Sequence, residues 1–481
     1  MAFCSAAATP RTCRQSETRS SPTPAITAIV VTDDPHRVGN YCTYLHRFRT
    51  SALVIVVLLA VAAFGTAATL WVTHGSFVLE RLPSTDPAIH SDFDTFWRST
   101  RALLAGQDIY RTGAGFPNLN PPLLTVLIAP LGLLEFLPAY RLFVLVTVVL
   151  VVATMAAVAV ELRAAAAAAV PVTVAVLLSS PVLATLGLGQ VYGLLTAGLA
   201  AAWILHRHGR LALEGAVIGL VVALKPSLAP VLLIPVLRRQ WPTLAVALVT
   251  GVTATIAGWA IAGRESLPEW VNLLVGNPVQ TYWDNASLPG ALLRLTSATD
   301  WGRPLVELPG GTVLGLVLGG VLLVLTAWLT RRPPASGPDT ALWSMTAASL
   351  LVSPLSWHNY LMLLMPGVLV LVTRGRWQVA ALLLSLAMIG MEWPTIWYGK
   401  DGTASAVPLS LYCAILLTYW AALLTRPAPA RRALALHGPH ETGERSTIPV
   451  GAGPAVELVG PRGEVHPDPL LRDPGPPEHV G

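Results

Sequence analysis

The chain has 481 residues, of which 53% are hydrophobic and only 12% charged, and its formal net charge is +5. Soluble domains average about 25% charged residues, so this composition excludes an ordinary soluble protein. The basic residues fall mainly in short clusters between long apolar runs, a pattern typical of membrane-protein loops rather than of a nucleic-acid-binding surface. The four Cys residues form no CxxC or Cys/His cluster, which argues against a zinc site or a disulfide framework.

Two polar tails flank the apolar part of the chain. Residues 1–45 are rich in Ser, Thr and Pro, and residues 426–481 are rich in Pro, Gly, Glu and His. Segments with so few large apolar side chains cannot bury enough surface to fold alone. We therefore expect disordered cytoplasmic tails at 1–45 and 426–481, on either side of a membrane domain over residues 50–425.

The first apolar run, residues 51–72, follows His46, Arg47 and Arg49. It is longer than the roughly 7–15-residue apolar core of a cleaved signal peptide, so it predicts a retained signal anchor. Basic residues recur in the later short loops, and by the positive-inside rule they place both termini in the cytoplasm. These loops are marked by Arg163 and by the basic clusters at 206–210, 238–239, 331–332, 374–376 and 431–432.

One stretch, residues 211–237, is too short for the two crossings of about 20 residues each that this alternation requires. Lys225-Pro226 lies in its middle, and proline lacks the backbone N–H that a helix interior needs. We therefore expect two short or broken helices meeting at this dipeptide. The expected spans, twelve in all, are 52–73, 139–161, 168–186, 189–205, 211–225, 227–237, 241–262, 310–330, 340–355, 359–373, 378–394 and 408–425.

Four stretches would then face the outer side: residues 73–140, 263–311, 353–360 and 392–408. The first is the largest and contains an acidic, aromatic segment at 91–98. It also contains an apolar piece at 123–134, which would break the alternation of basic loops if it crossed the membrane. We expect that piece to lie in the interface or to enter the membrane and return.

The candidate site residues each have a plain structural interpretation as well as a functional one. Asp94 and Arg98 are i,i+4 partners on an expected helix, where an ion pair is the simplest interpretation, and catalytic use of Asp92 or Asp94 is the alternative. Lys225 lies inside an apolar stretch, so it is either a functional group or a lysine that snorkels to the interface. His358 is an acid/base, a phosphate-binding group, or an interfacial histidine packed among aromatic side chains.

These groups together suit the transfer of a sugar from a lipid-linked phosphosugar to an alcohol. That reaction needs a base for the hydroxyl proton and cations or amide dipoles for the departing phosphate. It needs no general acid, because the phosphate leaves as an anion. The spacing of the residues alone does not favour this reaction over transport.

The order of the motifs resembles glycosyltransferase family 87, the polyprenyl-phosphate-mannose-dependent mannosyltransferases of actinobacteria. The resemblance covers roughly residues 50–425. Its blocks are Asp92-Phe93 with Phe96-Trp97, residues 103–110, Asn120-Pro121-Pro122, Gly189-Gln190, Leu224-Lys225-Pro226, Asn285-Ala286-Ser287 with Arg294, and residues 353–358 ending at His358. The chain departs from the family at Asn120, where Tyr is usual, at Ala286, where Gln is frequent, and at His358-Asn359, where Asp-His is frequent.

The resemblance implies an all-α polytopic membrane protein of the GT-C type, with about twelve transmembrane helices and a structured first outer loop. It implies inverting transfer, without metal or cofactor, from a polyprenyl-phosphate sugar to a lipid-linked glycan on the outer face of the cytoplasmic membrane. The sugar expected is mannose, with arabinofuranose as the alternative.

The resemblance also implies roles for single residues. Asp92 would be the base, with Asp94 as the alternative and as the group that orients Arg98 in the substrate site. Lys225 and Arg294 would bind the donor phosphate. The remaining substrate-binding residues would be His358 for polar contacts to donor or acceptor, and Gln190, Asn120 and Asn285 for the lining of the site.

Two other classes of protein share some of these features. A transporter or lipid flippase would show paired broken helices in two similar halves, whereas only one break is evident in the sequence. A membrane scaffold would not need Asp, Arg, Lys and His gathered in loops on one side.

Overall fold

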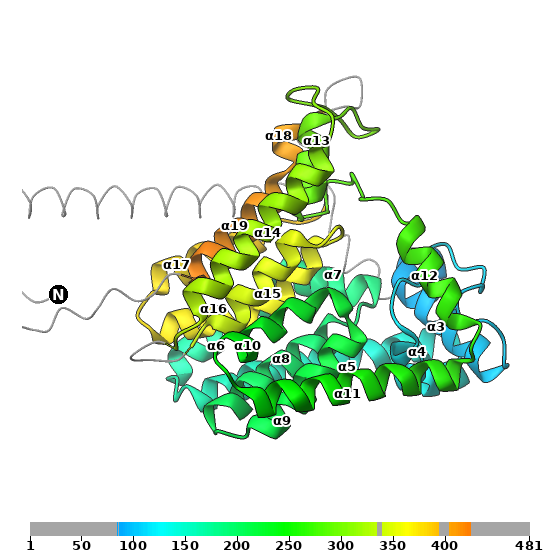
Figure 1. The fold of residues 1–481 in the computed structure, drawn as a ribbon, viewed down its shortest axis with the longest axis horizontal. Helices are drawn as coiled ribbons and strands as arrows, with labels where there is room; N and C mark the ends of the chain where they lie inside the picture. The colour runs from blue at the N-terminus through cyan, green and yellow to red at the C-terminus, as the bar shows by residue number, and fades with distance from the viewer. Residues whose placement is uncertain (1–83, 85, 334–338, 394–403, 425–481) are drawn as a thin grey trace, which may run out of the picture. The chain divides into compact units, whose positions relative to one another are not determined.

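The computed structural model describes residues 84, 86–333, 339–393 and 404–424. The two tails and the expected first span, 52–73, lie outside these residues. The described part is mostly helical, and Figure 1 labels its elements. In chain order they are η1 (Pro87–His90), α3 (Ser91–Leu104), α4 (Pro122–Ile128), η2 (Ala129–Leu133), α5 (Phe136–Glu161), α6 (Ala166–Leu177), α7 (Ser180–Leu188), α8 (Tyr192–Arg207), α9 (Leu211–Leu224), η3 (Pro226–Leu232), α10 (Leu233–Leu237), α11 (Trp241–Ala262), α12 (Ser266–Gly276), α13 (Leu288–Thr296), β1 (Gly302–Arg303), α14 (Gly311–Thr330), α15 (Ala341–Val352), η4 (His358–Leu364), α16 (Met365–Thr373), α17 (Trp377–Ala387), β2 (Ala404–Ser405), α18 (Ala406–Leu409) and α19 (Leu411–Leu424).

Three of the described helices, α5, α11 and α14, are long and apolar enough to cross a membrane, and a fourth crossing is made if α6 and α7, bent by 47° at their break, count as one span. The other apolar helices are shorter, so the twelve crossings remain a prediction. The three long helices expose large apolar side chains such as Leu145, Val249 and Val324. Helices with this much exposed apolar surface are typical of segments that face lipid.

Helices α9 and α11 pack side by side along glycines (Figure 1). A Cβ on Gly215 would overlap the carbonyl of Thr243, and a Cβ on Gly219 would overlap the carbonyl of Ala247. Small residues at such a contact let the two backbones approach closely, which stabilises helix pairs that lack a hydrophobic driving force in lipid. This pairing fixes the axis of α9, at whose end the expected break lies.

The break at Lys225-Pro226 is confirmed. Helix α9 ends at Leu224, Lys225 has non-helical backbone angles (φ −141°, ψ 86°), and η3 begins at Pro226 as a 3-10 helix. The missing N–H of the proline explains why the α-helix does not continue. The expected helix over 227–237 is therefore a 3-10 turn followed by the five-residue α10.

Helix α3 carries the acidic, aromatic segment of the first expected outer loop and packs against η2, α4, α5 and α7. Phe93 is fully buried among aromatic rings that include Phe136 and Tyr140, both at the start of α5. The apolar piece at 123–134 folds into the short α4 and η2 and contacts α3. These contacts anchor the first turn of α3, where Asp92 lies.

Backbone pairing joins segments of the second, third and fourth expected outer loops. Strands β1 and β2, two residues each, pair in parallel. An isolated antiparallel bridge joins Asn285 to Trp357. Apart from this small sheet, the described residues agree with the expected all-α class.

Candidate active site

The two aspartates of α3 have different surroundings. Asp94 is buried, and both of its carboxylate oxygens accept a hydrogen bond from Nε of Arg98, at 2.9 and 2.8 Å. Asp92 is partly exposed and lies close enough to Tyr192, the first residue of α8, to interact with its phenol electrostatically. The plain interpretation of Asp94 and Arg98 as an i,i+4 ion pair thus describes the geometry, and Asp92 is the carboxylate that faces another helix.

Lys225 lies near the same tyrosine, Tyr192, with which Asp92 interacts. Its Nζ donates a hydrogen bond to the hydroxyl of Tyr360 at 3.1 Å, and it lies 4.8 Å from the centre of that ring and 5.7 Å from the centre of Tyr192. The two tyrosine rings are themselves 4.3 Å apart. A carboxylate from α3 and an ammonium from the break after α9 are therefore gathered around one pair of tyrosines. Neither tyrosine was singled out from the sequence.

Gln190 follows the turn that positions α7 against α3. Gly189 ends α7 with positive φ, 73°, and a Cβ on it would overlap Cβ of Phe93. Glycine adopts this left-handed conformation without steric cost, so the chain can turn while α3 stays in contact. Gln190 is buried, and its N–H donates to the carbonyl of Thr185 at 2.8 Å. It lies between α7 and the Tyr192 end of α8.

Asn120 belongs to a hydrogen-bond network in the first loop. Its carbonyl accepts a bond from the hydroxyl of Tyr110 at 2.9 Å, and its side-chain amide lies 3.4 Å from Oδ1 of Asn118. Burial, with a smaller contribution from Asp108, raises the pKa of Tyr110, which therefore remains a hydrogen-bond donor at neutral pH. Asn118 is the more buried of the two asparagines and also donates to Ser99 at 3.1 Å.

Asn285 joins the second expected outer loop to the third, and Arg294 binds backbone within the second. The Asn285 amide donates to the carbonyls of Gln280 and Pro354, and its Oδ1 accepts from the backbone N–H of Ser356 at 3.0 Å. Arg294 is fully buried and donates to the carbonyls of Tyr282 and Asn285 at 2.8 and 3.0 Å. Both side chains thus hold the backbone of these loops in place.

Arg294 remains charged in this setting. Burial lowers its pKa to about 10, although Cys413 and Asp284 act in the opposite direction. At neutral pH the guanidinium is therefore still protonated, and its carbonyl partners satisfy part of its donor capacity. The sequence motif indicated the importance of this residue, and the structure shows which backbone groups it contacts.

His358 is fully buried at the start of η4 and lies between two polar partners. Its Nδ1 is in direct contact with Oδ1 of Asp284, and its Nε2 lies 3.2 Å from Oγ of Ser180. The imidazole also stacks on the ring of Tyr412, with centroids 5.0 Å apart. Asp284 was missed in the sequence, where its position directly before Asn285-Ala286-Ser287 was the available signal.

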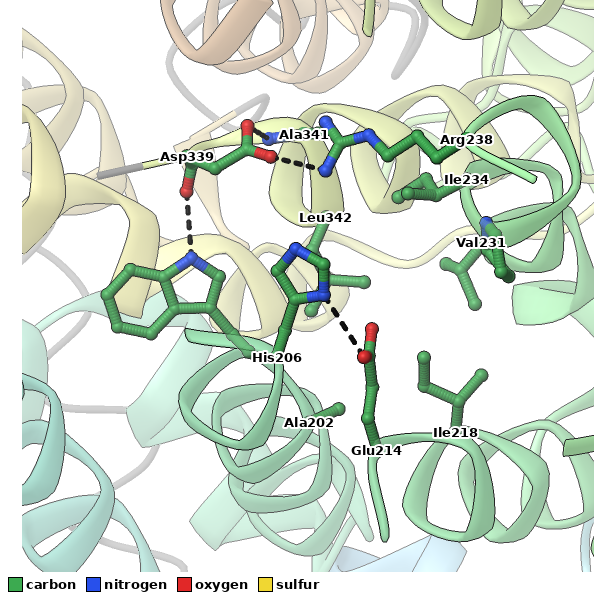
Figure 2. A pocket seen from close by; sticks show the side chains of 12 residues that line it. Ala202, His206, Glu214, Ile218, Val231, Ile234, Arg238, Asp339, Ala341 and Leu342 are labelled. Carbon is green, nitrogen blue, oxygen red and sulfur yellow. Dashed lines mark hydrogen bonds and ion pairs between the residues drawn. The ribbon is translucent and has the colours of Figure 1, made fainter. Parts of the chain in front are cut away.

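An enclosed cavity elsewhere in the fold contains none of the expected site residues. The cavity lies near the start of α9, whereas Lys225 follows the end of that helix. Its polar lining residues are His206, Glu214, Arg238 and Asp339 (Figure 2). Its volume of about 30 Å³ holds one or two water molecules and no sugar. Within the ranges that the structure describes, no three His, Cys, Asp or Glu side chains are grouped to hold a metal ion.

Comparison with known proteins agrees with this arrangement of motifs. The profile of glycosyltransferase family 87 matches residues 118–354. The alpha-(1→3)-arabinofuranosyltransferase of Mycobacterium tuberculosis (strain CDC 1551 / Oshkosh) is 30% identical over 365 residues, which are 72% of this chain and 79% of the relative. The polyprenol-phosphate-mannose-dependent alpha-(1-2)-phosphatidylinositol mannoside mannosyltransferase of Mycobacterium tuberculosis (strain ATCC 25618 / H37Rv) is 30% identical over 365 residues, which are 68% of this chain and 82% of the relative.

The polyprenol-phosphate-mannose-dependent alpha-(1-2)-phosphatidylinositol mannoside mannosyltransferase of Mycolicibacterium smegmatis is 28% identical over 370 residues, which are 69% of this chain and 79% of the relative. No solved structure shows a significant match to the chain. The matched relatives are enzymes, which sets the transporter and scaffold interpretations aside. The chain belongs to glycosyltransferase family 87 and is a membrane glycosyltransferase.

Proposed function

We propose that the protein transfers mannose from a polyprenyl-phosphate donor to a lipid-linked glycan, in a single inverting displacement with Asp92 as the base. The observation that carries this proposal is the meeting of Asp92 and Lys225 around Tyr192 and Tyr360. A base and a cation at one place are the two groups that this reaction requires. The reaction would take place on the outer face of the cytoplasmic membrane, with both termini inside.

The proposed step balances with these groups. The acceptor hydroxyl loses its proton to the carboxylate of Asp92 while its oxygen bonds to the anomeric carbon of the sugar. The bond from that carbon to the phosphate oxygen breaks, and the phosphate leaves with the electron pair beside the ammonium of Lys225. Tyr360, which accepts a hydrogen bond from Lys225, orients the ammonium. Asp94 is the alternative base, and both of its oxygens accept from Arg98, which suits it to orienting that guanidinium.

The remaining expected residues support this step with different contacts. His358 lies on η4, which also carries Tyr360, and Gln190 lies just before α8, which begins at Tyr192. We therefore assign both residues to polar contacts with the substrates. Arg98 and Asn120 would line the first-loop side. Asn285 bonds to Pro354 and Ser356, so we assign it to holding the loop of Asp284 and the loop of His358 together. Arg294 binds the carbonyls of Tyr282 and Asn285, so we assign it to holding the loop of Asp284 itself in place.

Arabinofuranose is the second candidate sugar. A relative of similar identity carries the name alpha-(1→3)-arabinofuranosyltransferase, so the family contains both donors. The base and the phosphate site serve either sugar, since both would leave from a polyprenyl phosphate. The choice between them therefore has to be tested with both donors.

The test is transfer of label in membranes that contain the native chain, with radiolabelled polyprenyl-phosphate mannose and polyprenyl-phosphate arabinofuranose in parallel. We expect label from the mannosyl donor to enter a lipid-glycan. Asp92→Asn should reduce transfer by at least about 100-fold, the usual effect of losing a general base. Asp94→Asn is the matched control and should retain most of the activity.

Three outcomes would change the proposal. Transfer of arabinofuranose alone would overturn the choice of sugar. Loss of activity in Asp94→Asn but not in Asp92→Asn would exchange the roles of the two carboxylates. Absence of transfer by folded native protein with either donor would overturn the proposed donor class.

A further inference from the structure

The contact between His358 and Asp284 joins residues that are 74 positions apart in the sequence. Asp284 lies in the loop between α12 and α13, and only 4% of its surface is exposed. One of its oxygens contacts Nδ1 of His358 and also accepts from the backbone N–H of that residue at 3.4 Å. A buried carboxylate is costly unless it is paired, so this contact is required once Asp284 is placed there.

The opposite nitrogen of the same ring has its own partner. Nε2 of His358 lies 3.2 Å from Oγ of Ser180, the first residue of α7. A neutral imidazole donates from one nitrogen and accepts at the other, so a carboxylate beside Nδ1 selects the tautomer in which Nδ1 carries the proton. Nε2 is then the acceptor and faces the hydroxyl of Ser180.

This ring lies on an element of the proposed active site. The 3-10 helix η4 contains both His358 and Tyr360, and Tyr360 binds Lys225. Helix α7, which begins with Ser180, ends at the turn that places Gln190 beside α3. The orientation of the imidazole is therefore tied to two elements that meet the reacting groups.

We propose that Asp284 is a positioning residue that fixes the tautomer and orientation of His358, and that Ser180 is the hydroxyl to which Nε2 is directed. The inference rests on the proposed function for the consequence in catalysis, but the tautomer itself can be measured without activity. The ion contact between Nδ1 and the carboxylate restrains the ring, so that the Ser180 hydroxyl keeps one direction relative to the sugar and phosphate. Asp284 acts through His358 and need not touch the substrate.

Several other ionisable groups face this ring or its carboxylate. Arg294 on α13 interacts electrostatically with Asp284, and Tyr412 on α19 stacks on the imidazole. Glu392 and Asp284 both act on Tyr412, and Cys413 adjoins Arg294. Because Arg294 balances part of the charge of Asp284, removing the carboxylate leaves a net positive surrounding around His358.

The experiment compares Asp284→Asn with Glu214→Gln in the full-length protein. Glu214 is also a buried carboxylate paired with a histidine, His206, at 3.0 Å, but it lies near the start of α9, away from Lys225 (Figure 2). It therefore matches the structural cost of the change without adjoining the site. Ser180→Ala removes the hydroxyl beside Nε2, and folded protein is quantified for every variant by size-exclusion chromatography.

The first readout is kinetic. We expect Asp284→Asn to lower kcat by about 10-fold or more with KM changed less than two-fold, and to alter the acidic side of the pH–rate profile. Glu214→Gln should leave kcat and the profile unchanged per folded molecule. If Asp284 had a purely structural role, Asp284→Asn and Glu214→Gln would both lower the amount of folded protein. The folded Asp284→Asn protein would then keep the native kcat and pH–rate profile, and that result would overturn the proposal.

The second readout does not need transfer activity. Nitrogen-15 NMR of histidine-labelled protein in nanodiscs, with His358→Gln to assign the signal, reports which ring nitrogen carries the proton. We expect Nδ1–H in the native chain and a different tautomer or a mixture in Asp284→Asn. A native ring protonated at Nε2 alone would overturn the inference. Failure of the proposed sugar transfer would leave this measurement intact, so the two failures are distinguishable.

Discussion

Two buried carboxylates, Glu214 and Asp284, each pair with a histidine, and the two pairs differ in what they join. Glu214 and His206 are eight residues apart and connect the end of α8 to the start of α9 (Figure 2). Asp284 and His358 are 74 residues apart and connect two expected outer loops. The first pair stabilises a turn that local sequence already specifies, whereas the second brings together groups that only the fold places near one another.

The two pairs also differ in the charged and aromatic groups that surround them. Beside Glu214, a second ion pair joins Nη1 of Arg238 to Asp339 at 2.6 Å, and Trp203 donates to the carbonyl of Asp339 (Figure 2). Beside His358, η4 leads to Tyr360 and Lys225, where an ammonium meets aromatic rings and hydroxyl groups. The ion pairs beside Glu214 hold a helix end, whereas the ammonium of Lys225, which donates to a tyrosine hydroxyl, is suited to binding an anionic substrate.

The largest effect expected from this contrast is that of Lys225→Met. Removing the ammonium should reduce transfer by about 100-fold or more, since a preorganised charge at a developing anion contributes on that scale. The folded amount should stay near that of the native chain. Activity is measured with the radiolabelled donor, and Glu214→Gln serves as the control at the other end of α9. Native activity in folded Lys225→Met would remove this residue from the reaction.

The next effect is on stability, in Arg294→Met. Two buried carbonyls, of Tyr282 and Asn285, would lose their donors, at roughly 1–3 kcal/mol each. Thermal unfolding in detergent, followed by size-exclusion chromatography, should show a clear loss of stability. Arg238→Met is the matched variant, because Arg238 is also buried and donates to the carbonyl of Thr330. Both should lose stability, and only Arg294→Met should also lose activity per folded molecule.

A smaller effect is expected from Gly189→Ala. The added Cβ overlaps Phe93 and the residue keeps a positive φ, so the cost is of the order of 1–3 kcal/mol and falls on the contact between α7 and α3. Gly209→Ala, in the turn between α8 and α9, has a positive φ but no atom within 4 Å of the new Cβ. It should cost less and leave specific activity unchanged. If Gly189→Ala and Gly209→Ala lost equal specific activity, the contact between α7 and α3 would have no particular role in catalysis.

The smallest effect concerns the exposed ion pair between Glu269 of α12 and Arg111, at 2.8 Å. The hydrogen bond from Arg111 lowers the pKa of Glu269, so its contribution to stability is complete above the unfolded pKa near 4.5 and is lost as the pH falls through the lower folded value. Glu269→Gln should change activity less than two-fold at pH 7. Its unfolding temperature should match that of the native chain in acid or high salt. A difference in unfolding temperature between Glu269→Gln and the native chain that persisted both in acid and in high salt would contradict this account.

Much of the helical layout was predictable because apolar runs and proline act locally. The break at Lys225-Pro226 agreed with expectation, since it depends on a few adjacent residues. The ion pair of Asp94 with Arg98 was likewise visible as i,i+4 spacing. Span 52–73 and the tails lie outside the described residues, so those predictions stand as they were made.

The partners in the candidate site were not predictable in the same way. Tyr192, Tyr360, Asp284 and Ser180 are unremarkable residues in their own segments, and no local period marks them. They became candidates because α7, α8, η4 and the loop before α13 meet in space. Arg294 shows the converse, since its motif was noticed while its contacts to backbone carbonyls were not foreseen.

The sequence by itself determined that this is a helical membrane protein of glycosyltransferase family 87, because hydrophobicity, basic loops and ordered motifs are properties of the chain. Tertiary structure decided that Asp92 and Lys225 both lie near Tyr192 and that Asp284 contacts His358. The physical reason is that a buried polar side chain must find partners, and those partners come from wherever packing brings another element.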